Sequence, residues 1–247
     1  MSKALLKQLR KKLKSKASPQ KAKVLGSFFK TGRGEYGEGD VFIGVTVPVL
    51  RKLAKDYQAL SMKEIQALHQ SQIHEERMLA LLILMLQYQK EKANNRKKIF
   101  NYYLKNTRYI NNWDLVDVSA PHVVGHFLYA RNRRVLHRMA RTTDLWKKRI
   151  AIVATFHFIR KNEFQETLKI AKILLQDNHD LIHKAVGWML REVGKRNRHA
   201  LENFLEKQAH RMPRTTLRYA IERFDEQKRK YYLKFRIFLK KEKQCQF

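Results

Sequence analysis

The residue types most suited to chemistry gather in one short segment, Asn111-Asn-Trp-Asp-Leu-Val-Asp117. Trp113 and Asp117 are four residues apart, so a helix would place both side chains on one face. Asn112 is suited to cap that helix, and Asp114 favours its first turn. A carboxylate on a face that binds phosphates repels them, so Asp117 would need a chemical reason there. On spacing alone, a surface acid paired with a lysine is the simpler interpretation.

A second segment, Leu145-Trp-Lys-Lys-Arg149, places an arginine near the predicted start of a helix. A guanidinium in that position suits bidentate contact with a phosphate. A solvated basic turn explains Lys147 and Lys148 equally well.

A third segment, His183-Lys-Ala-Val-Gly-Trp-Met-Leu-Arg-Glu192, contains a glycine inside a predicted helix. A glycine there costs about 1 kcal/mol relative to alanine, so we expect close packing or close access at Gly187. Trp188 by itself is more often a core residue than a site residue.

The histidines and the single cysteine do not form a motif for metal binding or nucleophilic catalysis. His122 and His126 have the spacing of a zinc-protease helix but lack its glutamate. His179 and His183 form a similar pair, and neither pair has an evident third ligand. Because Cys245 is the single cysteine of the sequence, an intramolecular disulfide is excluded. Cys245 is also a poor candidate nucleophile. We therefore expect no metal and no cofactor.

Five of the nine glycines lie in the segment 32–44. It contains a formal G-x-G-x-x-G, but a dinucleotide site needs a strand before this pattern and a helix after it. Here a helix precedes the pattern and Glu38-Gly-Asp40 follows it. We therefore expect either a flexible connector or a loop whose backbone approaches DNA closely.

The charge of the chain indicates a polyanionic partner. Lysine and arginine number 53, aspartate and glutamate 22, and the formal net charge is +31. Release of counterions from phosphates would make such a surface bind nucleic acid in a salt-dependent way. A surface tuned for solubility and an anionic membrane are the alternatives, and nucleic acid is favoured over both.

Composition excludes several other classes. An apolar fraction of 44% with 11% aromatic residues is too high for a disordered chain. The most apolar run, Met78–Leu86, has about half the length that a bilayer requires, and the basic N-terminus lacks the apolar stretch of a signal peptide. We expect a cytoplasmic, nucleoid-associated protein without a membrane span.

Hydrophobic residues recur at spacings of three and four along almost the whole chain, which predicts an all-α fold. Ser61 and Glu64 form a capping-box pattern, and Pro121 should kink or restart the helix that contains it. The predicted helices are Lys3–Leu13, Lys21–Phe29, Val47–Leu60, Ser61–His69, Glu75–Tyr88, Arg96–Leu104, Asp114–Leu128, Arg133–Ala140, Trp146–Arg160, Glu163–Gln176, Leu181–Lys195, Arg198–Gln208, Thr215–Phe224 and Gln227–Lys240.

A weak internal period refines this prediction. Five residues near the starts of successive apolar helices are separated by 36, 36, 35 and 34 positions: Arg77, Trp113, Arg149, Lys184 and Arg218. One pair of helices per repeat of this length is typical of an α-solenoid. We expect about six HEAT-like repeats with a basic concave face, a single domain over residues 1–226, and a basic helix or tail over 227–247.

In these segments the chain resembles the AlkD family of DNA alkylation-repair glycosylases. The resemblance implies an α-solenoid of HEAT-like repeats whose basic concave face holds duplex DNA, in agreement with the charge and the period. It extends over about residues 21–224. The matching stretches are Trp113-Asp-Leu-Val-Asp117, Trp146-Lys-Lys-Arg-Ile-Ala151, Lys184-Ala-Val-Gly-Trp-Met-Leu-Arg-Glu192 and Pro213-Arg-Thr-Thr-Leu-Arg-Tyr-Ala-Ile221.

The resemblance also implies an activity, hydrolysis of the N-glycosidic bond of N3- or N7-alkylated purines. By motif position, Asp117 corresponds to the catalytic carboxylate, Trp113 and Trp188 to tryptophans that pack against the deoxyribose, and Arg149 to an arginine that holds the backbone. An alkylated purine already carries a positive charge and leaves without a general acid. The carboxylate then stabilises an oxocarbenium-like sugar cation. The family is thought to act without a base pocket, and the sequence shows no pocket motif.

The DNA-binding set predicted here also includes Lys148, Lys184, Arg191 and Phe28. Phe28 stands where some family members carry a tyrosine that faces the lesion, so this chain lacks that hydroxyl. The expected partner is duplex DNA containing alkylated purines, bound by a monomer. The alternatives are a non-catalytic solenoid that recognises distorted or branched DNA, and a protein-interaction scaffold.

Overall fold

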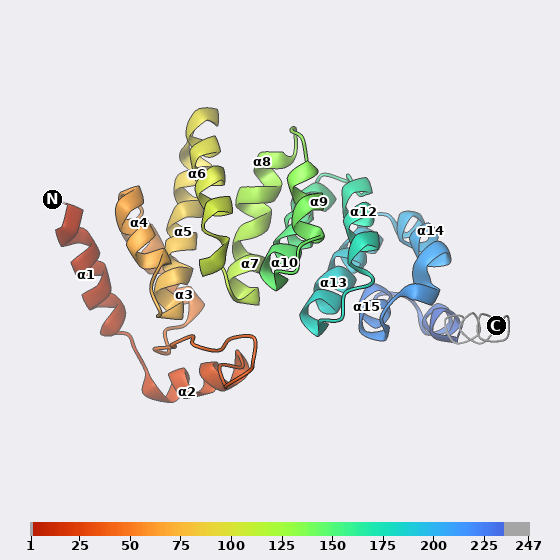
Figure 1. The fold of residues 1–247 in the computed structure, drawn as a ribbon, viewed down its shortest axis with the longest axis horizontal. Coiled ribbons are helices and arrows are strands. Elements are labelled where there is room, and N and C mark those ends of the chain that lie inside the picture. The colour runs from red at the N-terminus through yellow and green to blue at the C-terminus, as the bar shows by residue number, and fades with distance from the viewer. Residues whose placement is uncertain (1, 235–247) are drawn as a thin grey trace. The chain divides into compact units, whose positions relative to one another are not determined.

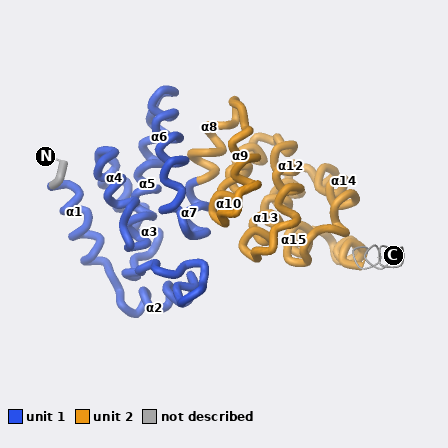
Figure 2. Tube along the Cα trace, in the orientation of Figure 1, with its two compact units in different colours: residues 1–119 blue, residues 120–247 orange. Residues whose placement is uncertain are grey.

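The structure is a computed structural model that describes residues 2–234 (Figure 1). Between these residues it contains helices and turns but no strand, so the predicted all-α class is confirmed; a single isolated bridge pairs Val41 with Ile73. No helix in this part of the chain has the length and hydropathy needed to span a bilayer. The chain divides into two compact units, residues 1–119 and 120–247 (Figure 2).

Unit 1 is built around one buried helix, α5. It comprises α1 (Ser2–Lys14), α2 (Pro19–Phe28), α3 (Val47–Asp56), α4 (Met62–His69), α5 (His74–Lys90), α6 (Ala93–Lys105), a 3-10 turn (Thr107–Tyr109) and α7 (Trp113–Ala120), which ends at the boundary of the unit. Helices α3, α4 and α6 pack against α5, and α1 packs against α4. Because α5 is surrounded, all its residues from 74 to 85 are buried, charged ones included.

Two polar contacts order this unit, of which the first was expected from the sequence. The Ser61 hydroxyl accepts the Glu64 N–H, and the Glu64 carboxylate accepts the Ser61 N–H at 2.9 Å, which confirms the capping box at the start of α4. Arg10 on α1 donates three hydrogen bonds of 2.8–3.2 Å to the carboxylate of Glu76 on α5. Charge-assisted pairs of this geometry are among the stronger polar contacts.

Unit 2 repeats a simple packing pattern. It comprises a π-helical turn (Pro121–Gly125), α8 (His126–Leu128), α9 (Arg134–Ala140), α10 (Leu145–Ala154), α11 (Phe156–Arg160), α12 (Gln165–Leu174), α13 (Asp180–Arg196), α14 (Arg198–Gln208), a 3-10 turn (Ala209–Arg211), α15 (Arg214–Ala220) and a helical segment over 226–234. Helix α13 packs against both α10 and α15. These three helices carry Arg149, Lys184 and Arg218, so the sequence period corresponds to successive packed helices, as in a solenoid.

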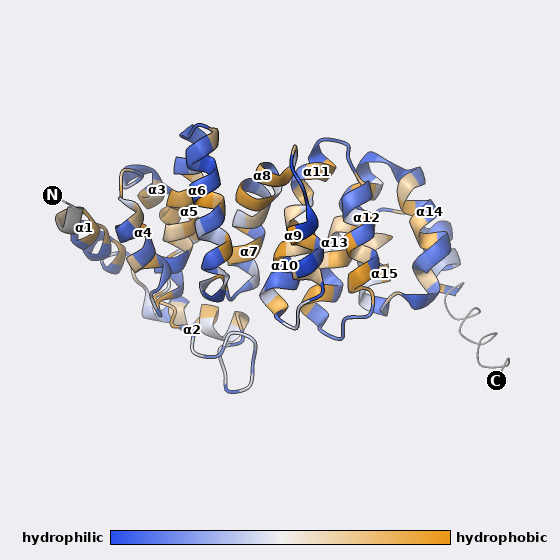
Figure 3. Ribbon diagram, turned by 45° about the horizontal axis from the view of Figure 1, so that its top comes forward, coloured by the Kyte–Doolittle hydropathy of each residue, from blue (hydrophilic) through white to orange (hydrophobic). Residues whose placement is uncertain are grey.

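Three features expected from the sequence stay predictions. They are the number of repeats, the basic concave face, and the division into a domain over 1–226 and a tail over 227–247. The predicted helix Gln227–Lys240 is observed over 226–234, and its remainder lies outside the described residues, as does Cys245. Most helices carry both hydrophilic and hydrophobic residues along their length (Figure 3). This mixture is expected of helices that bury one face and expose the other.

Two predicted helices end four residues early, namely Val47–Leu60 and Thr215–Phe224. Helix α3 ends at Asp56 and α15 ends at Ala220. Leu60 and Phe224 are nevertheless buried in the turns that follow. The hydrophobic pattern therefore continues beyond the helical backbone, which explains the error.

Two other predicted helices are interrupted. The predicted helix Asp114–Leu128 stops at Ala120 and continues as a π-helical turn from Pro121, as expected from a proline without an N–H. The predicted helix Trp146–Arg160 breaks at Thr155, whose hydroxyl donates to the Ile152 carbonyl at 2.6 Å. Such local side-chain bonds to the backbone compete with regular helix.

The close packing predicted at Gly187 is confirmed. A Cβ atom on Gly187 would lie 2.4 Å from the Cβ of Tyr219 and 2.7 Å from the carbonyl oxygen of Thr216, both on α15. The absence of a side chain thus permits α13 and α15 to approach each other.

We expect Gly187→Ala to lower the free energy of unfolding by about 1–3 kcal/mol, because the backbones of α13 and α15 must separate. Thermal unfolding followed by circular dichroism measures this loss. Gly194→Ala is the matched control on the same helix, because its Cβ would meet the mobile end of Leu201. An equal loss in both variants would contradict the packing explanation.

Candidate functional site

Helix α7 places Trp113 and Asp117 one turn apart. The Asn112 side-chain oxygen accepts the Trp113 N–H at 2.8 Å, and the Asp114 carboxylate accepts the Leu115 N–H at 2.8 Å. The predicted contributions of Asn112 and Asp114 to the start of the helix are therefore confirmed. Trp113 and Asp117 are both half-buried, and their catalytic role stays a prediction.

Aromatic rings hold Trp113 in place. Its indole stacks on Phe29 with ring centroids 5.0 Å apart, and the edge of Phe28 meets it at 5.9 Å. Phe29 also stacks on Phe42 at 5.0 Å, and Phe42 stacks on the His74 imidazole at 4.4 Å. Rings at these separations attract one another beyond simple burial. The position of Trp113 is thus determined by residues far away in the sequence.

A buried aspartate connects the glycine-rich loop to α5 and α7. Asp40, within the glycine-rich segment, accepts hydrogen bonds from Arg77 at 2.6 Å and His74 at 3.2 Å. It also accepts from Asn111 at 3.1 Å and Asn112 at 3.3 Å, immediately before Trp113. The Asp40, His74 and Arg77 side chains are 3–4% exposed. Sequence analysis missed this cluster, because Asp40 is separated from its four partners by 34 to 72 positions.

His74 lies between two carboxylates. Its Nδ1 faces Asp40 and its Nε2 faces Asp114 at 2.8 Å, and a protonated ring can donate to both carboxylates. The Arg77 guanidinium also lies 3.4 Å from Nδ1 and opposes the protonation. Burial by itself lowers the pKa of His74, but the hydrogen bonds to Asp114 and Asp40 outweigh burial and raise it. Burial by itself raises the pKa of Asp40, yet hydrogen bonding with His74 and the charge of Arg77 bring it below its usual value.

A second buried carboxylate fixes the chain that follows the loop. Glu75 accepts backbone N–H bonds from Ile43, Gly44 and Val45 at 2.8–3.2 Å. The His74 N–H donates to the Val41 carbonyl at 2.8 Å. The start of α5 therefore positions the backbone of residues 41–45.

The glycine-rich loop bonds to its own carboxylates. The Gly32 N–H donates to Glu35 and the Gly34 N–H donates to Glu38, both at 2.9 Å. These two N–H groups already have anionic partners. Close approach of this loop to DNA stays a prediction.

The predicted DNA-binding residues of unit 2 are paired with acids. Lys148 bonds to Asp177 at 2.6 Å and Lys184 to Asp180 at 2.7 Å, and Arg191 forms an ion pair with Glu222. A phosphate at any of these cations would either replace the carboxylate or share the cation with it. Their contact with DNA stays a prediction.

Arg149, which was expected near a helix start and suited to contact with a phosphate, is buried between helices. Helix α10 begins at Leu145, capped by Asp144, so Arg149 lies in the second turn. Its side chain is buried, and it donates to the Leu181 carbonyl at 2.6 Å. Trp188 is half-buried with its ring 5.7 Å from Phe156. Convergence of these unit 2 residues with Trp113 and Asp117 of unit 1 stays a prediction.

The paired histidines have local structural partners. His179 caps α13 by accepting the Leu181 N–H at 3.1 Å, and His183 donates to the Asp177 carbonyl at 2.5 Å. The His126 and His157 rings lie 5.1 Å apart. Within residues 2–234, no three His, Cys, Asp or Glu side chains gather in a way that suits a metal ion.

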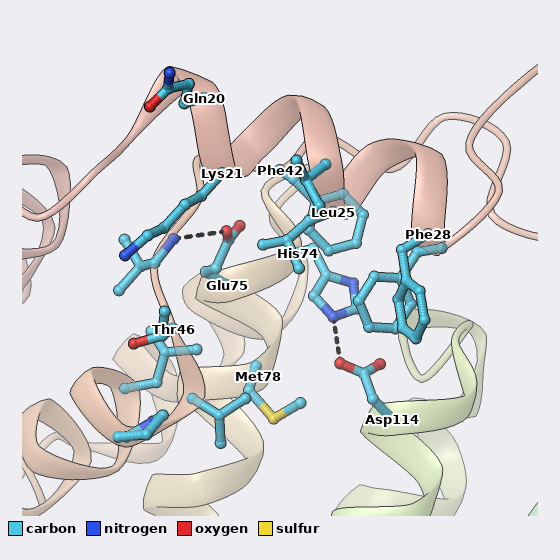
Figure 4. A pocket seen from close by; sticks show the side chains of 16 residues that line it. Gln20, Lys21, Leu25, Phe28, Phe42, Thr46, His74, Glu75, Met78 and Asp114 are labelled. Carbon is cyan, nitrogen blue, oxygen red and sulfur yellow. Dashed lines mark hydrogen bonds and ion pairs between the residues drawn. The ribbon is translucent and has the colours of Figure 1, made fainter.

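Unit 1 contains a cavity of about 790 Å³ that sequence analysis did not predict (Figure 4). Helix α2 covers it, and α3, α5 and α7 contribute to its wall. The hydrogen-bonded pair His74 and Asp114 lies at one side. The lining residues are Gln20, Lys21, Val24, Leu25, Phe28, Phe29, Phe42, Val45, Thr46, Val47, Pro48, Leu50, His74, Glu75, Met78 and Asp114.

The raised pKa of His74 predicts a pH-dependent contribution to stability. The ion pairs of protonated His74 stabilise the fold fully below the unfolded pKa of about 6.5, and this contribution is lost as pH rises through the native pKa. We therefore expect His74→Gln to cost about 3–5 kcal/mol at about pH 6 and clearly less at about pH 9. Thermal unfolding at both pH values measures the difference.

The exposed His199 provides the control, as His199→Gln. A cost of His74→Gln that is equal at both pH values, or that grows with pH, would contradict the assignment of a protonated His74 between Asp40 and Asp114.

Comparison with known proteins identifies the family. The model of the DNA alkylation repair enzyme family matches residues 9–224. A solved structure described as a predicted DNA alkylation repair enzyme from Enterococcus faecalis is 17% identical, with a TM-score of 0.66 over 85% of this chain and 98% of that one. The structure of smu.31 from Streptococcus mutans UA159 is also 17% identical, with a TM-score of 0.52 over 91% and 100%.

At this identity the two solved structures show a shared fold alone. No curated protein gave a significant match to the chain. The family model, however, spans most of the sequence, including the segments around Trp113, Arg149 and Trp188. The chain therefore belongs to the DNA alkylation repair enzyme family.

Proposed function

We propose that this protein is a DNA glycosylase that hydrolyses the N-glycosidic bond of N3- or N7-alkylated purines in duplex DNA. Membership of the DNA alkylation repair family supports a role on such DNA. The observation that carries the proposal is the pair on α7, where Asp117 follows Trp113 by one turn and Phe29 holds the indole at 5.0 Å. A fixed aromatic face beside a carboxylate suits the stabilisation of a cation.

The reaction needs little from the protein besides this stabilisation. When the bond between C1′ and the purine nitrogen breaks, its electron pair goes to the ring and neutralises the positive charge of the alkylated base. The positive charge then resides on the deoxyribose as an oxocarbenium-like cation. Asp117 stabilises that cation and orients a water molecule, which adds to C1′ and gives up its proton to the Asp117 carboxylate. Trp113 and Trp188 pack against the sugar in this proposal.

The basic residues hold the DNA in the same proposal. Lys148, Lys184 and Arg191 contact the backbone of the duplex, and buried Arg149 supports this surface through the Leu181 carbonyl. The net charge of +31 supports a salt-dependent association. Phe28 lies against Trp113 and offers a ring without a hydroxyl. The protein acts as a monomer, without metal or cofactor, in the cytoplasm at the nucleoid.

We expect Asp117→Asn to reduce release of N7-methylguanine and N3-methyladenine from methylated duplex DNA by about a hundredfold or more, because the sugar cation loses its counter-charge. Affinity for the same duplex should stay equal or increase, since a repelling charge is removed. Free base is quantified by chromatography, and binding by fluorescence anisotropy.

Asp56→Asn is the matched control, because it removes the same charge from an exposed carboxylate at the end of α3. Equal base release by wild type and Asp117→Asn would contradict the role of Asp117. Tight, salt-sensitive binding by a wild-type protein that releases no base would favour the non-catalytic DNA-binding alternative.

A further inference from the structure

Helix α1 carries three lysines in a row on the side that faces away from unit 1. With 3.6 residues per turn, Lys7, Lys11 and Lys14 lie within about 60° of one another around the helix axis. All three are exposed, whereas Leu9 and Leu13 on the opposite side are 0% and 1% exposed. We call these three residues the α1 lysine row.

The helix that presents this row is firmly attached to unit 1. Figure 1 shows α1 at the N-terminal end of the unit beside α4, against which it packs. Arg10 bonds to the buried carboxylate of Glu76 on α5, and Lys12 pairs with Asp56 at the end of α3 at 3.3 Å. Because the backbone of the row is already fixed, binding through it orders side chains alone.

The positive charge of the row is not neutralised by unit 1. Helix α1 contains no acid, and among the described residues no carboxylate forms an ion pair with the three lysines. The predicted DNA-binding cations of unit 2, in contrast, rest on acids. Like charges one helical turn apart repel and destabilise a helix. Such a row therefore favours an external polyanion that relieves the repulsion.

The length of the row matches the spacing of phosphates in duplex DNA. Lys7 and Lys14 are seven residues apart, which is about 10 Å along the helix. Each strand of a duplex presents one phosphate per roughly 3.4 Å of its axis. A strand that runs along α1 therefore offers about three phosphates to three lysines.

The packing of α1 argues against a lipid surface as the polyanion. A basic helix that lies on a membrane inserts its apolar face among the lipids. Here the apolar residues Leu9 and Leu13 are buried within unit 1, so only the charged side is accessible. The charge of the row is available, but the apolar face is not.

We propose that the α1 lysine row is an additional contact with duplex DNA, in which Lys7, Lys11 and Lys14 bind successive phosphates of one strand. The inference rests on the proposed function for the identity of the polyanion. The residues assigned there to the DNA and the lesion lie on α2, α7, α10 and α13, and none lies on α1. Phosphate contacts carry no sequence information, so the row lengthens the contact with any duplex, damaged or not.

The salt dependence of binding tests the row directly. We expect the full chain with Lys7→Gln, Lys11→Gln and Lys14→Gln to bind undamaged duplex DNA at least about tenfold more weakly at low salt. Because each phosphate contact contributes about 0.9 to the slope of log affinity against log salt, the slope should become shallower by roughly two to three. Fluorescence anisotropy over a series of salt concentrations measures both quantities, and an unchanged slope overturns the proposal.

The matched control removes the same charge from another helix of unit 1. Lys97, Lys98 and Lys105 on α6 are exposed, and their triple replacement by glutamine should leave the slope close to that of the wild type. Equal losses in the two triple variants would show an effect of net charge alone and overturn the proposal. Thermal unfolding checks the fold, and the row variant should melt no lower than the wild type because mutual repulsion is removed.

The lipid alternative has its own outcome. Vesicles of phosphatidylserine and phosphatidylcholine are mixed with the wild type and the row variant at about 0.15 M salt, and bound protein is measured by sedimentation. We expect no difference between the two proteins. Vesicle binding that is lost in the row variant, together with an unchanged DNA slope, overturns the proposal in favour of lipid.

Turnover separates this inference from the proposed function. On methylated duplex DNA we expect the row variant to keep kcat and to raise KM at least about tenfold, because the row binds DNA without touching the sugar. A wild type that releases no base, but whose slope depends on the row, supports the row and contradicts the glycosylase. Base release that requires Asp117, with a slope indifferent to the row, supports the glycosylase and contradicts the row.

Discussion

The geometry of unit 1 depends on a single buried carboxylate, Asp40. Four side chains donate to it from two other parts of the chain, two from α5 and two from the residues before α7. A buried carboxylate is stable only when its partners compensate the loss of water, so these donors and Asp40 require one another. The glycine-rich loop, the start of α5 and the start of α7 are consequently held at one point. Trp113, the cavity and the imidazolium of His74 are all adjacent to that point.

The sequence was sufficient to predict the features of the fold that depend on local residue patterns. Hydrophobic spacing predicted the helices, and the period of about 35 residues predicted successive packed helices, as α10, α13 and α15 are. The expected cap by Asn112 corresponds to its hydrogen bond with Trp113 at the start of α7. These features arise from neighbours within a few positions, or from the same pattern repeated. The resemblance through Trp113-Asp-Leu-Val-Asp117 then indicated the family, which the family model confirmed.

Long-range electrostatics and packing were not predictable in the same way. The partners of Asp40 and the cavity under α2 depend on which distant residues the fold brings together. One signal was present in the sequence but was not used. Helix α2 carries Val24, Leu25 and Phe28 on an apolar face, and such a face implies something apolar to cover. The burial of Arg149 was not predictable for a similar reason, because α13 supplies the carbonyl that it meets.

The ion pairs of unit 2 have a consequence for how a polyanion is recognised. Lys148, Lys184 and Arg191 each rest on a carboxylate, so their long side chains are already ordered before a partner arrives. Ordering such a side chain normally opposes association, and here that entropic cost is reduced. If these cations bind DNA as proposed, each phosphate either replaces a carboxylate or shares its cation with it. That requirement favours a phosphate whose position matches the cation over one that only passes nearby.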